Sequence, residues 1–326
     1  MVENLAEKII RFEKRSWAMK PYAAFRWGSG MPCPVRLVVN TYKGCDFKHK
    51  YCYVWQKCGK SKPKEGFRKS LKHDIKRAKE SGLDKLVAMV SSSTDPFQEI
   101  EKEHRETQFA LKELLDNGFK VLIMTRNPKM LLEKEYLEFA RNKNLFIDVS
   151  IPSLHENNPE SFFFGTVPKL EETLKAIKKL SAMGKDVRVK IEPVVPSVNG
   201  IQGQTEEELD ELVGRLKAAG VKLVISKAMR LNEDVPKPIY DKLIAYYKKN
   251  GFKQGINLVL SKEKRKELLQ PVLNACKKHK MPFCGCVETG TFSEKTSKCL
   301  CRGEKVPPIM SIVGEASKEW VTEEVE

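Results

Sequence analysis

The sequence lacks any long hydrophobic run. No apolar stretch approaches the roughly 20 consecutive residues with which a helix spans a bilayer. Residues 1–17 form a charged, amphipathic stretch without the apolar centre of a secretory signal. We therefore expect a cytoplasmic protein that does not insert into a membrane.

Acidic residues are in short supply. The 326-residue chain carries 59 lysines and arginines against 43 aspartates and glutamates, which gives a formal net charge of +16. Such a surplus favours anionic partners such as nucleic acid, although a surface rich in lysine and glutamate is also common in heat-adapted proteins. The sequence also lacks a series of aromatic residues that would mark a platform for single-stranded nucleic acid. Nucleic acid is therefore a partner that charge alone suggests.

Cysteine, in contrast, is plentiful. The chain has nine cysteines, and in a reducing compartment this number indicates metal or redox chemistry rather than disulfides. Cys45 and Cys52 share one loop with His49, at spacings of four and three residues. Two thiolates and an imidazole at these spacings can close around one metal centre. The alternative is a pair of buried free cysteines and a surface histidine.

From Val35 onward, short apolar runs alternate with amphipathic stretches of helical length. We expect strands at Arg36–Thr41, Lys85–Ser91, Lys120–Thr125, Leu145–Ile151, Val187–Val195 and Val221–Ser226. We expect helices near residues 68–81, 102–117, 129–142, 167–183 and 205–219. Near-continuous apolar strands separated by helices are typical of a parallel sheet covered by helices. Six such units with right-handed crossovers predict an α/β fold, a partial (β/α)6 barrel of the TIM type.

The rest of the chain is arranged around this barrel. Residues 1–34 are expected to form a basic helix and a connection rich in proline and glycine, and residues 35–232 the barrel itself. Residues 233–326 are expected to form a helical, lysine-rich extension that ends in a small cysteine-containing segment. The length suits one large domain with such an appendage.

Polar residues follow the predicted strands, where the chemistry of such folds collects. Thr94 and Asp95 come after the second strand, and the proline that follows holds Asp95 in an extended or turn conformation. Arg126 follows the third strand, and its guanidinium could hold a carboxylate with two hydrogen bonds or cap a turn at the surface. Lys190 and Glu192 in the fifth strand should share one face because strand side chains alternate.

The loop with Gly44-Cys45 at one end and Tyr51-Cys52-Tyr53 at the other resembles the cluster-binding loop of the radical S-adenosylmethionine superfamily. The sequence of this loop is most similar to that of the spore photoproduct lyase-like branch. The middle ligand position departs from the family pattern because it holds His49 and not cysteine. The resemblance covers residues 35 to 232, since the strand-end residues match the family elements in their order along the chain.

The resemblance implies a [4Fe-4S] cluster whose open iron binds S-adenosylmethionine. Cleavage by one electron, which an electron donor must supply, then yields a 5′-deoxyadenosyl radical that abstracts a substrate hydrogen. The residues expected to bind the cofactor on this basis, or to face it from the fifth strand, are Tyr53, Thr94, Asp95, Arg126, Ser150, Lys190 and Glu192. The expected cluster ligands are Cys45, His49 and Cys52.

The histidine leaves three interpretations open. His49 can ligate an iron, although imidazole donates less electron density than thiolate and raises the cluster potential. Cys58, six residues beyond Cys52, can take its place as third ligand. In the third interpretation no catalytic cluster forms. Cys33 is a more distant candidate that is better explained as a small buried hydrophobe.

The end of the chain holds two further cysteine pairs. Cys284 and Cys286 form one Cys-x-Cys pair, and Cys299 and Cys301 form the other. Four thiols in two close pairs are enough for a second iron–sulfur cluster or a tetrahedral zinc. We therefore expect a second metal site in this extension.

Two functions are compatible with these patterns. The first is a radical S-adenosylmethionine enzyme that modifies or repairs a macromolecule, with nucleic acid favoured over protein. The alternative is a noncatalytic protein on the same barrel that binds a metal or nucleic acid. The chemistry at the three ligand positions distinguishes the two.

Overall fold

The structure is a computed structural model that describes residues 5–21, 35–52, 54 and 59–285. Its centre is an eight-stranded sheet with the order β1-β2-β5-β6-β7-β8-β9-β12. The parallel strands are β2 (Arg36–Val39), β5 (Val87–Val90), β6 (Val121–Thr125), β7 (Leu145–Ser150), β8 (Val187–Val194), β9 (Leu223–Ala228) and β12 (Phe283–Gly285). The predicted parallel α/β sheet of a partial TIM-type barrel is confirmed.

Two edge strands were not expected from the sequence. β1 (Met19–Pro21) pairs antiparallel with β2, inside the segment that was predicted to be a helix and a connection. Asp74 holds this strand in place, because its Oδ2 accepts hydrogen bonds from the amides of Trp17, Ala18 and Met19 at 2.7–3.0 Å. At the other edge β12 pairs in parallel with β9, so part of the predicted extension belongs to the same sheet.

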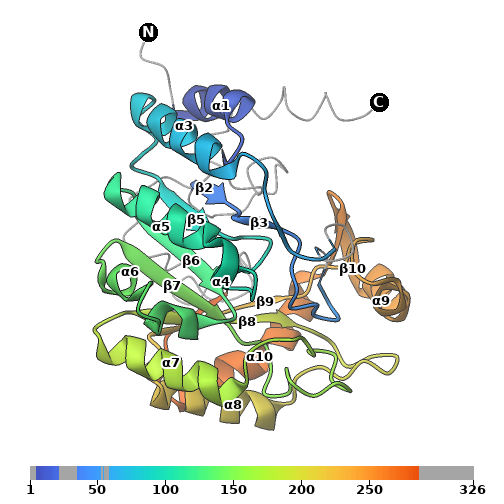
Figure 1. Cartoon of the computed structure of the whole chain (residues 1–326). Helices are drawn as coiled ribbons and strands as arrows, with labels where there is room; N and C mark the ends of the chain where they lie inside the picture. Colours follow the sequence, from blue (N-terminus) through green and yellow to red (C-terminus); the bar gives the residue numbers. More distant parts are fainter. Residues whose placement is uncertain (1–4, 22–34, 53, 55–58, 286–326) are drawn as a thin grey trace, which may run out of the picture.

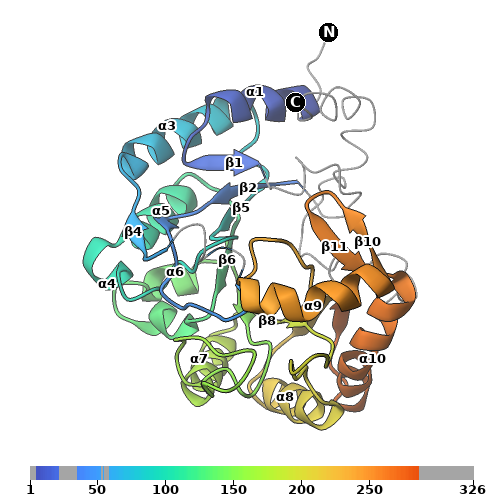
Figure 2. The same ribbon diagram turned by 90° about the vertical axis from the view of Figure 1, so that its right-hand side faces the viewer.

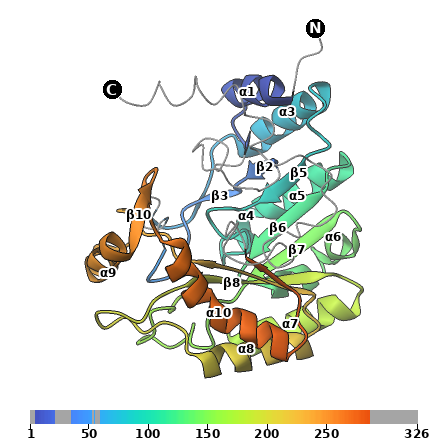
Figure 3. The same ribbon diagram turned by 180° about the vertical axis from the view of Figure 1, so that it is seen from behind.

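The helices lie along one face of this curved sheet (Figure 1). They are α1 (Leu5–Arg15), α3 (Phe67–Glu80), α5 (Glu106–Asp116), α6 (Leu137–Arg141), α7 (Leu170–Ala182), α8 (Glu206–Ala218) and α10 (Lys262–Lys278). Figure 3 shows α10 beside α8 when the molecule is seen from behind, and both contact the core around β9. The division of the chain at residue 232 remains a prediction.

Two of the predicted helices are wrong in detail. The helix expected at 102–117 is split into α4 (Glu101–His104) and α5 at Arg105, whose φ of 54° interrupts the helical backbone. The helix expected at 129–142 is a 3-10 helix, η2 (Pro128–Leu132), followed by the short α6. Both segments follow strand ends, where side-chain contacts with the loops decide the backbone path.

The two faces of the sheet differ in character. Alternate residues such as Leu37, Ala88, Ile123, Ile147 and Val189 point towards the helices and belong to one large apolar core. The intervening positions form the inner face of the barrel. There a small apolar cluster around Val38, Val87, Met89 and Leu122 gives way to charged side chains on β7 and β8.

A second, smaller unit lies beyond the carboxyl ends of the strands (Figure 2). It contains α9 (Lys237–Asn250) and the hairpin of β10 (Gly251–Gln254) and β11 (Asn257–Leu260). A separate apolar cluster that includes Phe162, Val195, Leu243 and Tyr247 joins it to the loops after β7 and β8. None of the helices in the described part of the chain is both long and apolar enough to cross a membrane.

Candidate functional site

The loop with the two cysteines begins directly after β2. β3 (Tyr42–Lys43) and β4 (Lys62–Pro63) pair across its base and close it. Gly44 has a φ of 84°, and a Cβ at this position would lie 2.6 Å from the Gly59 carbonyl oxygen, so only glycine fits. Asp46 Oδ1 accepts the Ser61 amide at 3.0 Å and fixes the other side of the base. The chain therefore presents Cys45 and Cys52 from a closed loop at the mouth of the barrel.

Cys45 is buried and Cys52 is half-buried, and both are free thiols. Burial, with a contribution from the nearby Asp95 carboxylate, raises the pKa of the Cys45 thiol to about 12. The Cys52 side chain also raises it, which places the two sulfurs in electrostatic reach of each other. Because thiolates are the metal-binding form, a metal at this position must displace the thiol proton.

The side chain of His49 lies against Gly165. Its ring is buried, and a Cβ at Gly165 would lie 2.7 Å from its Nε2, so the imidazole packs directly on the Gly165 backbone. The Nε2 atom is buried, and no described residue forms a hydrogen bond with it. Burial, followed by the positive charge of Arg126, holds the pKa of His49 well below its usual value, so the ring is neutral.

The donors fit an iron–sulfur cluster in part. Cys45 and Cys52 supply two of the expected thiols, but within residues 5–21, 35–52, 54 and 59–285 no three His, Cys, Asp or Glu side chains come close enough to hold a metal ion. His49 as third ligand therefore stays a prediction that needs the imidazole to turn away from Gly165. Cys33, Cys58 and Tyr53 lie outside the described residues.

Asp95 connects the ends of β5 and β6. Its Oδ1 accepts the Phe97 amide at 2.8 Å and the Thr125 hydroxyl at 2.9 Å, and its Oδ2 accepts the Arg126 amide at 2.6 Å. Burial raises its pKa to about 6, although these hydrogen bonds lower it. Thr94 is buried beside it and donates to the Tyr42 carbonyl oxygen at 3.4 Å. Asp95 thus fixes the backbone that carries Arg126.

Arg126 is the centre of a buried polar network. Its Nη1 donates to Glu156 Oε2 at 2.5 Å and to the Ser150 carbonyl oxygen at 3.2 Å, and its Nη2 donates to the Tyr51 hydroxyl. The side chains of Arg126 and Glu156 are only 9% and 8% exposed. The guanidinium that was predicted to meet a ligand carboxylate already holds a carboxylate of the chain itself.

Two residues of this network were missed by the sequence reasoning. Glu156 lies in the loop after β7, and nothing in its sequence surroundings indicates a buried ion pair. Gln98 links the other loops, since its side chain bonds the Asp46 amide at 2.7 Å and the carbonyl oxygens of Asp95 at 2.8 Å and Gly44 at 3.3 Å. For Gln98, only its position three residues after Asp95 could have suggested a role.

The loop after β7 presses against the cysteine loop along its length. Lys50 N donates to the Phe164 carbonyl oxygen at 3.1 Å, and Thr166 N donates to the Phe47 carbonyl oxygen at 2.8 Å. Tyr51 stacks on Phe162 with 5.7 Å between ring centroids. Any movement of this second loop therefore reaches the cysteines, His49 and Arg126 together.

The inner face of β8 carries the predicted charged pair. Lys190 and Lys227 each place their Nζ 3.3 Å from Glu192 Oε2. Burial opposes ionisation of Glu192, but the two ammonium groups outweigh it and lower the pKa of the carboxyl. Its other oxygen, Oε1, is buried and has no hydrogen-bond partner in the described part of the chain. The shared face was predicted correctly; contact with a cofactor remains a prediction.

The C-terminal cysteines are described only in part. Cys284 lies in β12 opposite Ile225 of β9 and is buried in a small cluster with Leu223 and Ile225. Cys286, Cys299 and Cys301 lie outside the described residues. The second metal site therefore stays a prediction.

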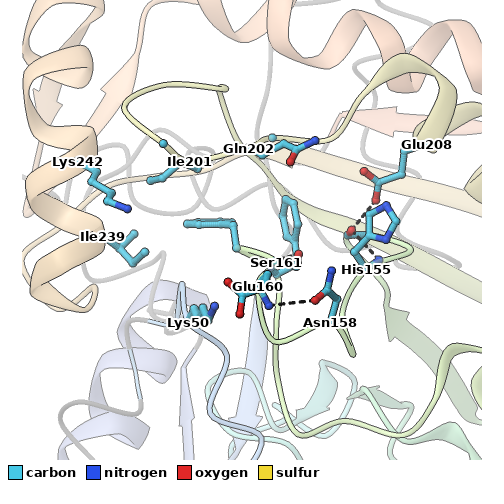
Figure 4. A pocket seen from close by; sticks show the side chains of 15 residues that line it. Lys50, His155, Asn158, Glu160, Ser161, Ile201, Gln202, Glu208, Ile239 and Lys242 are labelled. Carbon is cyan, nitrogen blue, oxygen red and sulfur yellow. Dashed lines mark hydrogen bonds between the residues drawn. The ribbon is translucent and has the colours of Figure 1, made fainter.

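A pocket of about 350 Å³ lies beside the loop after β7 (Figure 4). Its walls come from that loop, from the loop after β8, and from α9. Lys50 of the cysteine loop lies at its edge. The pocket was not expected from the sequence, because segments 50, 153–163, 200–208 and 239–242 meet only in the folded chain.

Known proteins resemble this chain in sequence or in fold. Uncharacterized proteins of Mycobacterium tuberculosis and Mycobacterium bovis are each 28% identical over 204 residues, which are 57% of this chain and 56% of the relative. The chain thus spans about half the length of the curated relatives it matches. A spore photoproduct lyase mutant with dinucleoside spore photoproduct superposes with a TM-score of 0.57 and 15% identity, over 79% of this chain and 78% of that chain.

A second spore photoproduct lyase mutant, with bound AdoMet and dinucleoside spore photoproduct, gives a TM-score of 0.54 and 16% identity over 74% of each chain. At these identities the structures show a shared fold. The family model of the radical SAM superfamily matches residues 39–216, which is more than half of the chain and includes both thiols of the first loop and Arg126. This chain belongs to the radical SAM superfamily.

Proposed function

We propose that this chain is an enzyme that uses a [4Fe-4S] cluster and S-adenosylmethionine to modify or repair a macromolecule. The observation that carries the proposal is the meeting of Cys45, Cys52, Asp95, Arg126 and the end of β7 around one mouth of the barrel. In parallel α/β folds this edge is where ligands bind.

Each of these residues has a role in the proposal. Cys45 and Cys52 hold two irons, and either His49 or Cys58 completes the set. When bound, the cluster and S-adenosylmethionine supply a carbon-centred radical that abstracts a hydrogen from the substrate. Thr94 and the end of β7 at Ser150 line the side from which S-adenosylmethionine enters, and the apolar inner wall around Met89 keeps water from the reacting atoms.

Arg126 binds the methionyl carboxylate in this scheme, and Glu156 must then give way or share the guanidinium. A guanidinium has five N–H donors, and the Glu156 contact engages Nη1 while Tyr51 engages Nη2. A ligand carboxylate that binds to the same edge competes directly with Glu156. The loop after β7, which carries Glu156, would then either shift or keep Glu156 on the guanidinium beside the ligand carboxylate.

Nucleic acid is the favoured substrate class. The net charge of +16 favours an anionic partner, and the two spore photoproduct lyase structures of similar fold hold a dinucleoside spore photoproduct. The reaction also needs an external electron donor, since no step within the chain supplies the electron.

The test is anaerobic reconstitution with iron and sulfide, followed by addition of S-adenosylmethionine and dithionite. We expect release of 5′-deoxyadenosine, and we expect the Cys45→Ala variant to release none. A reconstituted wild-type protein that binds S-adenosylmethionine but releases no 5′-deoxyadenosine would end the proposal.

One observation favours the noncatalytic alternative. His49 is turned onto Gly165 and does not approach the two thiols as a third donor. The variant His49→Cys separates the two functions, because it restores the family ligand. A large gain in cleavage over the wild type would mean that the natural chain is a binding protein or a weak catalyst, whereas an unchanged or lower rate supports His49 or Cys58 as the working ligand.

A further inference from the structure

The pocket beside the loop after β7 has a divided lining. Figure 4 shows Lys242 and Ile239 of α9 on one side and Glu208 and His155 on the other. Lys50 reaches the same region from the cysteine loop, with its ammonium hydrogen-bonded to the Pro159 carbonyl oxygen. The volume of about 350 Å³ lies in the range of sites for one small ligand unit.

The cationic side is open to a ligand. The Lys242 ammonium extends over Gly200, with Nζ 3.8 Å from where a Cβ would stand, and the described residues offer it no hydrogen bond or ion pair. On the opposite side Glu208 is already engaged, because its Oε1 accepts the Leu154 amide at 2.9 Å and the Ser153 hydroxyl. The lining thus holds two ammonium groups, those of Lys50 and Lys242, and two carboxylates, those of Glu160 and the hydrogen-bonded Glu208.

The middle of the pocket suits a flat ring with polar edges. Ile201, Ile239 and Phe162 give it an apolar wall, and Tyr51 braces Phe162 from behind. Asn158 and Gln202 also line the pocket (Figure 4). Asn158 Oδ1 accepts the Glu160 amide at 3.0 Å, so the Asn158 amide nitrogen and the Gln202 amide are the groups that can hydrogen-bond the edge of a base. An anionic group at one end and a hydrogen-bonding ring at the other describe a nucleotide.

We propose that this pocket binds one nucleotide unit of the substrate, with its phosphate beside Lys242 and Lys50 and its base against Ile201, Ile239 and Phe162. The inference rests on the proposed function, because it names the substrate class and where a unit of it is held. A pocket of this size takes a single unpaired unit and excludes a base pair. The strand that carries it must therefore be single or locally opened.

The test is binding of a fluorescein-labelled single-stranded deoxyoligonucleotide and, by saturation-transfer NMR, of thymidine 5′-monophosphate to the full chain. Neither assay contains reductant or S-adenosylmethionine, so the result is independent of radical chemistry. We expect Lys242→Ala to weaken both by about tenfold, as for loss of a hydrogen bond to a charged group. Ile239→Trp, which fills the pocket, should abolish thymidine 5′-monophosphate binding.

Lys253→Ala is the matched control, since this exposed lysine lies on the β10 hairpin outside the pocket. It should change oligonucleotide binding less than twofold. Equal losses in the Lys242 and Lys253 variants would mean general charge attraction and would overturn the proposal. Binding of an acidic peptide that depends on Lys242 while thymidine 5′-monophosphate does not bind would assign the pocket to a protein substrate instead.

Binding of nucleotide without any cleavage of S-adenosylmethionine would leave this inference standing and remove the proposed enzyme activity. Cleavage of S-adenosylmethionine without nucleotide binding in the pocket would overturn this inference and leave the proposed enzyme activity standing.

Discussion

The two faces of one sheet follow different rules in this molecule. Towards the helices, the alternate residues of β2, β5, β6, β7 and β8 are mostly aliphatic and buried, as Ile147 and Val149 are. Towards the inside, the neighbouring residues of β7 and β8 are charged: Asp148 and Arg188 form an ion pair at 2.5 Å with 3% and 4% of their side chains exposed. Side chains on β7 and β8 therefore differ in chemistry between the two faces, whereas the inner face of β2, β5 and β6 is apolar like the outer one.

This difference shows which face stabilises the fold and which serves the site. Buried apolar area stabilises in proportion to its size, whereas a buried ion pair gains little over an apolar pair of the same shape. Because these charges give so little stability yet occupy the inner side of two successive strands, we infer that they have a role in binding. Variants on the two faces of the sheet test this division.

Breaking the inner ion pair should have the largest effect on stability. Asp148→Leu leaves the Arg188 guanidinium buried without its carboxylate and should cost about 3–5 kcal/mol of unfolding free energy. The double variant Asp148→Leu with Arg188→Met should recover most of that loss. Urea unfolding of wild type and both variants measures it. If single and double variants were equally unstable, the inner charges would be structural and the comparison of faces would fail.

Truncation on the two faces of β7 should give unequal losses. Ile147→Ala opens a cavity in the core under the helices and should cost about 2–4 kcal/mol. The adjacent Phe146 points inward and is only half-buried, so Phe146→Ala should cost less although more atoms are removed. The order of the two urea midpoints checks this, and a reversed order would count against the division.

Removal of Arg126 should weaken binding of S-adenosylmethionine and should also destabilise the fold, because it leaves the Glu156 carboxylate buried without its cation. Arg126→Gln takes away the charged donor proposed for the methionyl carboxylate and should weaken S-adenosylmethionine binding by about 10–100-fold. Lys129→Gln changes an exposed lysine nearby and serves as the control. Calorimetric titration of the reconstituted protein gives both affinities. An unchanged affinity in the Arg126 variant would assign this guanidinium to Glu156 alone.

The smallest effect is expected on the stability of a Glu192 variant at acidic pH. Because Lys190 and Lys227 lower its pKa in the folded state, the carboxylate stabilises the fold above the unfolded pKa near 4.5. This contribution is lost as pH falls through the lower folded value. Thermal unfolding from pH 6 to pH 3 should therefore show a shallower decline for Glu192→Gln than for wild type. If the unfolding temperatures of both proteins fell in parallel with pH, Lys190 and Lys227 would not stabilise the Glu192 carboxylate in solution.

Local patterns predicted much of the sheet and the order of its polar residues. Apolar runs bounded by Asp95 and Arg126 can be read from the sequence because strand, turn and following polar residue are contiguous. Alternation also placed Lys190 and Glu192 on one face correctly, since it depends only on strand geometry. A local contact also sets the start of α8, where the Thr205 side chain accepts the Glu208 amide.

Features that depend on distant segments could not be read in the same way. β1 forms because Asp74, more than fifty residues away, accepts hydrogen bonds from three backbone amides in and beside the strand. The Glu156 carboxylate reaches Arg126 only when the loop after β7 folds back over the mouth. The direction of His49 depends on Gly165, which leaves room for an imidazole only because it has no side chain. Contacts of this kind leave no periodic or spaced signal in the sequence.

The central claim is that the two thiols of the first loop hold an iron–sulfur cluster at the barrel mouth. The most direct measurement is the iron content and electron paramagnetic resonance of the anaerobically reconstituted chain, compared with a Cys45→Ser, Cys52→Ser double variant. The difference should be about four irons per chain, and the reduced signal that only the wild type shows should shift when S-adenosylmethionine is added. Equal iron in both proteins, or a signal that S-adenosylmethionine leaves unchanged, would contradict the claim.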